Sequence, residues 1–304
     1  MKRRTFVKGT VLAGAAAALP VAGLSCATVA RRPDGSPESM PVDQYLAQGA
    51  RVMWVAPHPD DECISGSLLA RASLYYKNPV YMLVLTHGEG GECCRTEGCK
   101  PDLATVRGEE LRRVAERYNA TLQHESFWNV PLPVESFPKR HKIFERWRQQ
   151  KDPVALVAEA MRRFKPDLLL TFDPDRGATG HPEHQLGARI ATAGVRLAAH
   201  PGTDLAGLKP HRVGRTYRLL AKHWILSLFG AADPGDITET WDSDLPSGAG
   251  MTCREFMAWA TRLHRSQDTD MGSVRKYVWL FAPMKMRQVD PFTEIKDPAE
   301  PPPA

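Results

Sequence analysis

The sequence predicts an α/β fold built on a mostly parallel β-sheet. Short apolar runs of strand length alternate with longer amphipathic segments, and polar loops separate them. Such apolar runs are typical of parallel strands that are buried on both faces by crossover helices. The 304 residues, 42% hydrophobic and 25% charged, exclude a disordered chain and a multi-span membrane protein. We therefore expect a Rossmann-like three-layer sandwich.

Four strand and helix pairs carry this pattern. The predicted strands are 51–56, 80–86, 125–130 and 167–172, and the predicted helices are 62–76, 102–119, 153–164 and 182–199. In the second helix the residues Val106, Leu111 and Val114 fall near one face while Arg and Glu take the other, as an outer helix requires. Later segments are less regular: 215–230 predicts one or two strands and 253–267 predicts a helix.

The first 30 residues predict an export signal. They begin with a basic head, and an apolar stretch rich in Ala, Gly and Leu follows. The segment "RRTFVK" resembles a twin-arginine signal. An uncleaved membrane anchor stays open because the apolar stretch is nearly long enough to span a bilayer. Cys26 in "AGLSC" lies close to the lipoprotein pattern, so lipidation also stays open.

The rest of the chain predicts one domain. Residues 31–46, rich in Pro, Ser and charge, predict a linker, 47–296 the domain, and 297–304 a disordered tail. The basic excess lies largely in the signal, so the balance of charge indicates no nucleic-acid partner. We expect an exported bacterial protein, either periplasmic or held at the membrane by the anchor or a lipidated Cys26.

A cysteine cluster, "ECCRTEGC", predicts a short loop closed by a disulfide. In an oxidising compartment Cys99 is expected to bond to Cys93 or Cys94. A structural zinc site that also uses His87 is the alternative, although no paired Cys-x-x-Cys is present.

Polar loops follow the predicted strands. "PHPDDE" follows 51–56 and "DPDRGATGHPEH" follows 167–172, at the strand ends where ligands of an open parallel sheet bind. His58, Asp61 and His184 form the kind of three-ligand set that a catalytic zinc uses, with Asp60 and His181 beside it. The alternative is a plain turn in which Asp60 or Asp61 caps the next helix.

Four motifs carry a resemblance to a known family. "PHPDDE", "THGEGG", "FDPDRGATGHPEH" and "HRSQ" resemble the N-acetylglucosaminyl-phosphatidylinositol de-N-acetylase family, also called LmbE-like deacetylases. The resemblance covers about 51–190 and the short segment 264–267. It implies a Rossmann-like, zinc-dependent amidase that removes acetyl or related acyl groups from amino sugars and their conjugates.

The resemblance also implies a role for each site residue. His58, Asp61 and His184 would bind Zn²⁺, although another divalent ion such as Fe²⁺ suits the same ligands. Asp60 would act as the general base. A protonated His181 would stabilise the oxyanion of the transition state.

Further residues are expected around this centre. Glu89, Arg107 and His264 are predicted near the substrate, with a sharp turn as the alternative for Glu89 and a surface helix for Arg107. Glu183 stands where many relatives have Asp, which is expected to change how His181 is oriented. Three residues are predicted to orient the metal ligands by hydrogen bonds without contacting the metal: Glu62, Asp173 and Glu183.

The sequence thus predicts an exported zinc-dependent amide hydrolase that deacetylates an N-acetylated amino-sugar compound. The substrate is expected to be a small molecule, a glycan or a glycolipid. A metal-dependent hydrolase of a different bond or acyl group is one alternative. A non-catalytic carbohydrate-binding lipoprotein is the other.

Overall fold

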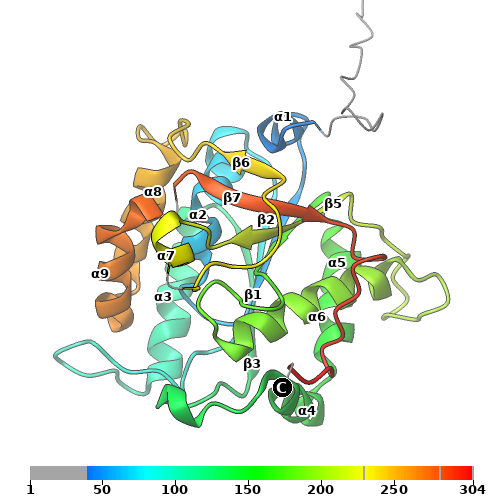
Figure 1. Cartoon of the computed structure of the whole chain (residues 1–304), viewed down its shortest axis with the longest axis horizontal. Helices are drawn as coiled ribbons and strands as arrows, with labels where there is room; N and C mark the ends of the chain where they lie inside the picture. Colours follow the sequence, from blue (N-terminus) through cyan, green and yellow to red (C-terminus); the bar gives the residue numbers. More distant parts are fainter. Residues whose placement is uncertain (1–39, 229, 281, 303–304) are drawn as a thin grey trace, which may run out of the picture. The chain divides into compact units, whose positions relative to one another are not determined.

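Seven strands form one sheet in the order β3-β2-β1-β4-β5-β7-β6 (Figure 1). The computed structural model describes residues 40–228, 230–280 and 282–302. The strands are β1 (Val52–Ala56), β2 (Val80–Thr86), β3 (Thr121–Phe127), β4 (Leu168–Thr171), β5 (Arg215–Leu220), β6 (Glu239–Trp241) and β7 (Met284–Val289). Strands β1 to β5 are parallel, and β7 is antiparallel to β5 and β6. The mostly parallel α/β fold is therefore confirmed.

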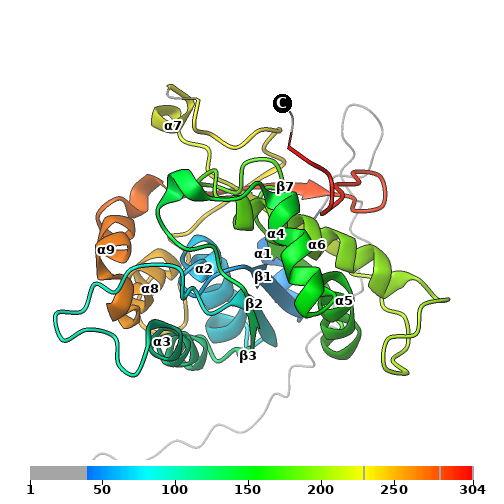
Figure 2. The ribbon, with the colours of Figure 1, turned by 90° about the horizontal axis from the view of Figure 1, so that it is seen from below.

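Helices cover both faces of the sheet (Figure 2). They are α1 (Val42–Ala47), α2 (Glu62–Ala70), α3 (Leu103–Arg117), α4 (Arg140–Gln150), α5 (Pro153–Phe164), α6 (Pro182–Ala199), α7 (Trp224–Leu228), α8 (Cys253–Ala260) and α9 (Asp268–Lys276). Side chains from α2, α3 and α8 share one hydrophobic cluster, and side chains from α4, α5 and α6 share a second. The two clusters lie on opposite faces of the sheet, which makes three layers.

Strand β1 illustrates why its sequence is apolar throughout. Alternate side chains of a strand point to opposite faces of a sheet. Val52 and Trp54 accordingly join the cluster with α2, whereas Met53 and Val55 join the cluster with α6. Every residue of the strand is buried, so no position in it tolerates a polar side chain without a partner.

The order of the strands decides where a ligand can bind. From β1 the chain moves outward through β2 to β3, and it then returns to place β4 and β5 on the other side of β1. The connections that leave β1 and β4 therefore diverge to opposite sides. Such a switch point in a parallel sheet opens a crevice at the carboxyl ends of the strands.

Several predicted elements need correction. Strand β3 spans Thr121–Phe127, four residues earlier than the predicted start at 125, because its exposed edge carries polar residues that hide the apolar pattern. Segment 215–230 holds one strand, β5, and then the short helix α7. The predicted helix 253–267 ends at Ala260 and continues as two 3₁₀ turns.

Both predicted ends of the domain also shift. Helix α1 lies in the predicted linker, and it folds because Val42 and Leu46 are buried in the core cluster. The compact unit accordingly begins at Pro41. Part of the predicted disordered tail is ordered by Arg189, which donates to the Asp297 carbonyl at 3.0 Å and to Glu300 Oε2 at 2.7 Å.

Candidate metal centre and active site

The loop after β1 supplies two of the predicted metal ligands. Asp61 stands directly before α2, but its side chain makes no helix-capping hydrogen bond. Its Oδ2 instead accepts a hydrogen bond from the backbone N–H of His58 at 2.7 Å. This contact folds the loop back on itself, so that the carboxylate and the His58 imidazole face the same space. The plain-cap interpretation of Asp61 is therefore wrong.

The loop after β4 leads into α6 and positions the third predicted metal ligand, His184, in the first turn of that helix. Asp173 accepts hydrogen bonds from the N–H groups of Asp175 and Arg176, each at 2.9 Å, and so turns the chain. Gly177 follows with φ +64°, and a Cβ there would lie 2.6 Å from the Cβ of His184. Glycine is therefore required for the loop to pass this close to α6. Asp173 thus shapes the loop, and its side-chain hydrogen bonds go to the loop backbone rather than to the predicted ligands.

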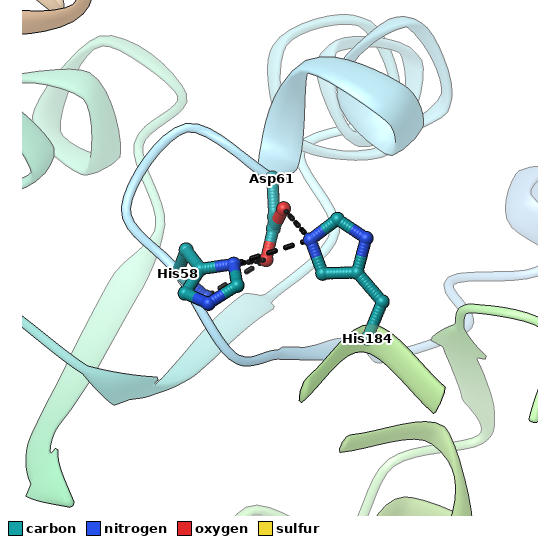
Figure 3. A group of neighbouring side chains, drawn as sticks. All are labelled: His58, Asp61 and His184. Atoms are coloured by element: carbon teal, nitrogen blue, oxygen red, sulfur yellow. Dashed lines mark hydrogen bonds and ion pairs between the residues drawn. The ribbon is translucent and has the colours of Figure 1, made fainter. Parts of the chain in front are cut away.

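Three donor atoms converge at the switch point (Figure 3). His184 Nε2 lies 3.1 Å from His58 Nδ1 and 3.0 Å from Asp61 Oδ1, and His58 Nδ1 lies 3.5 Å from Asp61 Oδ2. Ligands bound at about 2.0–2.1 Å in a tetrahedron lie roughly 3.3 Å apart, so these atoms fit a divalent cation. All three residues are buried. We call His58, Asp61 and His184 the metal triad.

The outer nitrogens of both histidines are occupied. His58 Nε2 lies 2.7 Å from Glu183 Oε2, and His184 Nδ1 lies 2.9 Å from the Gly177 carbonyl oxygen. A carboxylate and a carbonyl can only accept, so these nitrogens donate. The nitrogens that face the centre are then left with free lone pairs when the rings are neutral, which is the tautomer that a metal ligand needs.

The electrostatics of the centre also call for a positive charge. Burial acts to lower the pKa of His58, but Asp61 and Glu183 outweigh it and raise that pKa to about 10. Burial acts to raise the pKa of Asp61, but His184 and His58 hold it well below its usual value. Two buried carboxylates thus share one cation site, which a proton fills in the absence of a metal.

Asn129 is a site residue that the sequence analysis missed. Its Nδ2 donates to Glu183 Oε2 at 2.7 Å, and the N–H of Val130 donates to Glu183 Oε1 at 3.0 Å. Glu183 therefore orients His58, whereas the predicted effect of its side chain on His181 stays a prediction. The signal for Asn129 was its place in the polar loop "NVPLP" after β3.

Asp60, the predicted general base, lies beside the metal triad. Burial raises the pKa of Asp60 to about 6, although Arg107 acts in the opposite direction. Arg107 Nη2 lies 3.6 Å from Asp60 Oδ2 and donates to the Pro59 carbonyl at 2.9 Å. A carboxylate with a raised pKa can both take and release a proton near neutral pH. Arg107 is buried at the site, so the surface-helix alternative is wrong.

His181 lies at the N-terminal end of α6, and its ring is next to both histidines of the metal triad. The ring centroids are 4.8 Å from His58 and 5.0 Å from His184. His181 Nδ1 accepts a hydrogen bond from the N–H of Glu183 at 3.2 Å and thereby caps the helix. Burial, and then the neighbouring histidines, lower the pKa of His181 far below its usual value. The predicted protonated His181 is therefore corrected to a neutral imidazole whose Nε2 carries the hydrogen.

The remaining predicted residues have other contacts. Glu89 is exposed, and its Oε1 accepts from the N–H of Asn129 at 3.1 Å. His264 is fully buried and contacts Glu62, with 2.6 Å between Nε2 and Oε1. Glu62 occupies the Nε2 of His264, and the position of His264 near the substrate stays a prediction. Glu62 orients His264 and the Asp60 backbone rather than a metal ligand.

The cysteine cluster forms a disulfide between Cys93 and Cys99. Cys94 is free and exposed, so the zinc alternative for this cluster does not hold. The predicted signal and Cys26 lie outside the described residues. Within residues 40–302, apart from 229 and 281, we find no helix with the length and apolar character to cross a membrane.

Sequence comparisons identify what the chain is similar to. Residues 53–195 match the family described as PIG-L: GlcNAc-PI de-N-acetylase. A 1D-myo-inositol 2-acetamido-2-deoxy-alpha-D-glucopyranoside deacetylase 1 from Catenulispora acidiphila is 31% identical over 50% of this chain and 50% of its own length. A deacetylase of the same description from Corynebacterium urealyticum is 27% identical over 68% and 63%. The chain thus spans between half and two thirds of these curated relatives.

Solved structures share the fold. The N,N'-diacetylchitobiose deacetylase from Pyrococcus horikoshii has a TM-score of 0.57 at 18% identity, over 84% of this chain and 90% of that one. GalB, a 4-carboxy-2-hydroxymuconate hydratase from Pseudomonas putida, has a TM-score of 0.55 at 14% identity, over 79% and 95%. Two different reactions thus occur on this fold, so the fold by itself does not identify the reaction.

Proposed function

The chain carries a PIG-L domain over residues 53–195, and on this premise we propose that it is a metal-dependent amide hydrolase. Its proposed reaction removes an acetyl group from an N-acetylated amino sugar. The observation that carries the proposal is the metal triad. The facing nitrogens of His58 and His184 lie 3.1 Å apart, and each lies 3.0 to 3.5 Å from an Asp61 carboxylate oxygen, with Asp60 beside them. The names of the related deacetylases support the choice of the acetamido group.

Each residue has a role that follows from its contacts. His58, Asp61 and His184 would hold a divalent metal, Zn²⁺ being the favoured ion, which would supply the Lewis acid for activating water and polarising the amide carbonyl. Asp60 accepts a proton from the attacking water, the C–N bond breaks, and the carboxyl returns the proton to the leaving amine. The products are acetate and the free amino sugar.

His181 is proposed to stabilise the oxyanion that forms at the acyl carbon. Its Nδ1 is engaged with the N–H of Glu183, so its Nε2–H is the hydrogen-bond donor. A neutral imidazole at a helix N-terminus donates a hydrogen bond to the oxyanion and does not transfer its proton to it. Losing such a donor typically lowers kcat by about two to three orders of magnitude.

The test is turnover of defined N-acetylated sugars by the metal-loaded protein. We expect amine and acetate in equal amounts from at least one of 1D-myo-inositol 2-acetamido-2-deoxy-α-D-glucopyranoside, N,N′-diacetylchitobiose and N-acetylglucosamine. Asp60→Ala is the control, which is expected to keep the metal and to turn over about 10² to 10⁴ times more slowly. Release of phosphate from a phosphorylated sugar without amine would favour a different bond. Sugar binding without any turnover would favour the carbohydrate-binding module.

We also propose that the protein is exported. The twin-arginine-like segment "RRTFVK" supports this, and so does the Cys93–Cys99 disulfide, because disulfides persist in oxidising compartments. The expected result is a mature protein in the periplasmic or membrane fraction of a bacterial host, with a new N-terminus found by mass spectrometry. A lipid mass on Cys26 would select the lipoprotein form. An Arg3→Lys, Arg4→Lys protein that is still exported would contradict the twin-arginine route.

A further inference from the structure

We propose that Glu62, His264 and Gln267 form a clamp that positions the Asp60 carboxylate for proton transfer. We call these three residues the Asp60 clamp. The inference rests on the proposed function, since it explains how the general base of that reaction is held. It assigns a positioning role to the late segment 264–267, in which the side chains of His264 and Gln267 contact Glu62 and Asp60 rather than the metal triad.

The Asp60 backbone needs to be held. Its φ is +108°, a region that residues other than glycine rarely adopt. The N–H of Asp60 donates to Glu62 Oε2 at 3.1 Å. This hydrogen bond closes a ring over the one intervening residue, Asp61, and opposes relaxation of the strained φ. Glu62 is thus one arm of the clamp.

His264 keeps Glu62 in that place. Glu62 is 2% exposed and His264 is 0% exposed, and 2.6 Å separates Glu62 Oε1 from His264 Nε2. A carboxylate buried this deeply is strongly unfavourable without a hydrogen-bond partner. With Oε1 held by His264, Oε2 stays directed at the Asp60 backbone. His264 therefore acts on Asp60 through Glu62.

Gln267 holds the Asp60 side chain directly. Its Nε2 donates to Asp60 Oδ2 and also to the Pro59 carbonyl at 3.2 Å. Arg107 lies on the same oxygen, with Nη2 3.6 Å from Asp60 Oδ2. No described residue donates a hydrogen bond to Oδ1. The contacts therefore fix one carboxylate oxygen and leave Oδ1 as the atom that exchanges protons with the substrate and water.

The segment that carries the clamp is anchored independently of Asp60. The backbone N–H and the hydroxyl of Ser266 donate to Glu110 of α3, at 2.9 Å and 2.6 Å. The N–H of Cys94 donates to the Ser266 carbonyl at 2.8 Å. Because these contacts remain when the Gln267 side chain is changed, a Gln267 variant tests positioning without releasing the segment.

The experiment is a double-mutant cycle between Gln267→Met and Asp60→Ala on the full, metal-loaded chain. Gln267→Met is expected to lower kcat about 10- to 100-fold, with metal content and KM unchanged, as for other residues that orient a catalytic group. In the Asp60→Ala background the same change is expected to lower kcat no further, because its effect passes through Asp60. Equal losses in both backgrounds would mean a merely structural role and would overturn the clamp.

Two further variants control for folding and chemistry. Gln123→Met removes a partly buried Gln that hydrogen-bonds Tyr81 and Glu125 on β3, and it is expected to leave kcat unchanged. His264→Phe should lower kcat, whereas His264→Gln, which keeps an N–H donor for Glu62, should restore most of it. Equal kcat in the two His264 variants would contradict the indirect path through Glu62.

Crystal structures separate failure of the clamp from failure of the proposed function. If the wild-type protein turns over no N-acetylated sugar, the proposed function fails. The clamp is then judged by whether the Asp60 carboxylate rotates in Gln267→Met while the metal stays bound. An Asp60 carboxylate that keeps its orientation without Gln267 would overturn the clamp whatever the activity.

Discussion

The metal triad and the Asp60 clamp meet on one short loop, yet they are held in different ways. His58 and His184 are oriented by neighbours that belong to the polar loops themselves, Glu183 and Gly177. Asp60 is held by Glu62 of its own loop, and the residues that complete this support, Gln267 and His264, lie more than 200 positions away in the sequence. The difference teaches that binding a cation and aiming a base are separate tasks in this molecule, and that separate variants can disturb each of them.

The largest effect is expected from the metal triad itself. His184→Ala removes one of the three predicted metal ligands. We expect loss of both bound metal and turnover, measured by elemental analysis and by amine release. His181→Ala is the matched comparison, since it removes a neighbouring imidazole but no predicted ligand. Equal metal content in the two variants would break the division between ligand and oxyanion donor.

Asp60→Ala is expected to have the next largest effect. Removing a general base typically lowers kcat by about 10² to 10⁴. The metal triad is intact, so metal content should match that of the wild type. A loss of metal in Asp60→Ala would show that the base and the triad are not separable.

His181→Ala should reduce kcat by about 10² to 10³ while KM changes little. The reason is that the Nε2–H acts on the oxyanion, which exists only along the reaction path. Steady-state kinetics with the metal-loaded variant measure kcat and KM separately. A rise in KM with unchanged kcat would instead place His181 in substrate binding.

A smaller effect, on metal affinity, is expected from Glu183, which orients the metal ligand His58. Glu183→Gln replaces the acceptor of His58 by an amide that also has to satisfy Asn129 and the Val130 N–H. Metal affinity should fall about 10- to 100-fold, because such partners fix the tautomer and orientation of a ligand. Competition with a chelator measures it. Unchanged affinity would mean that Glu183 only supports the loop.

The smallest effect should come from the disulfide loop. The N–H of Cys94 contacts the Ser266 carbonyl, so Cys93→Ser, Cys99→Ser loosens one of the two anchors of the clamp segment. We expect a smaller loss of kcat than in Gln267→Met and no loss of metal. Metal loss in this variant would show that the loop supports the triad and not the clamp.

Individual helices and strands show which parts of the fold can be predicted from the sequence. Helices α5 and α6 have the bounds predicted for them, because strong 3.6-residue periodicity and a proline at the first turn mark their ends. Strand β3 was misplaced because an edge strand need not be apolar. Helix α1 was missed because six residues are too few to show a period. Tertiary contacts stabilise it, among them the burial of Val42 and Leu46 and the ion pair of Asp43 with Arg71.

The sequence by itself determined the parallel sheet and the composition of the metal triad, because strand periodicity and ligand chemistry are local properties of the chain. Only the tertiary structure decided that Asn129 holds Glu183 and that His264 is buried against Glu62. It also decided that Gln267 contacts Asp60. These contacts join residues whose separation along the chain carries no periodic signal. They exist because the order of the strands and the packing of α8 and the turns after it bring the segments together.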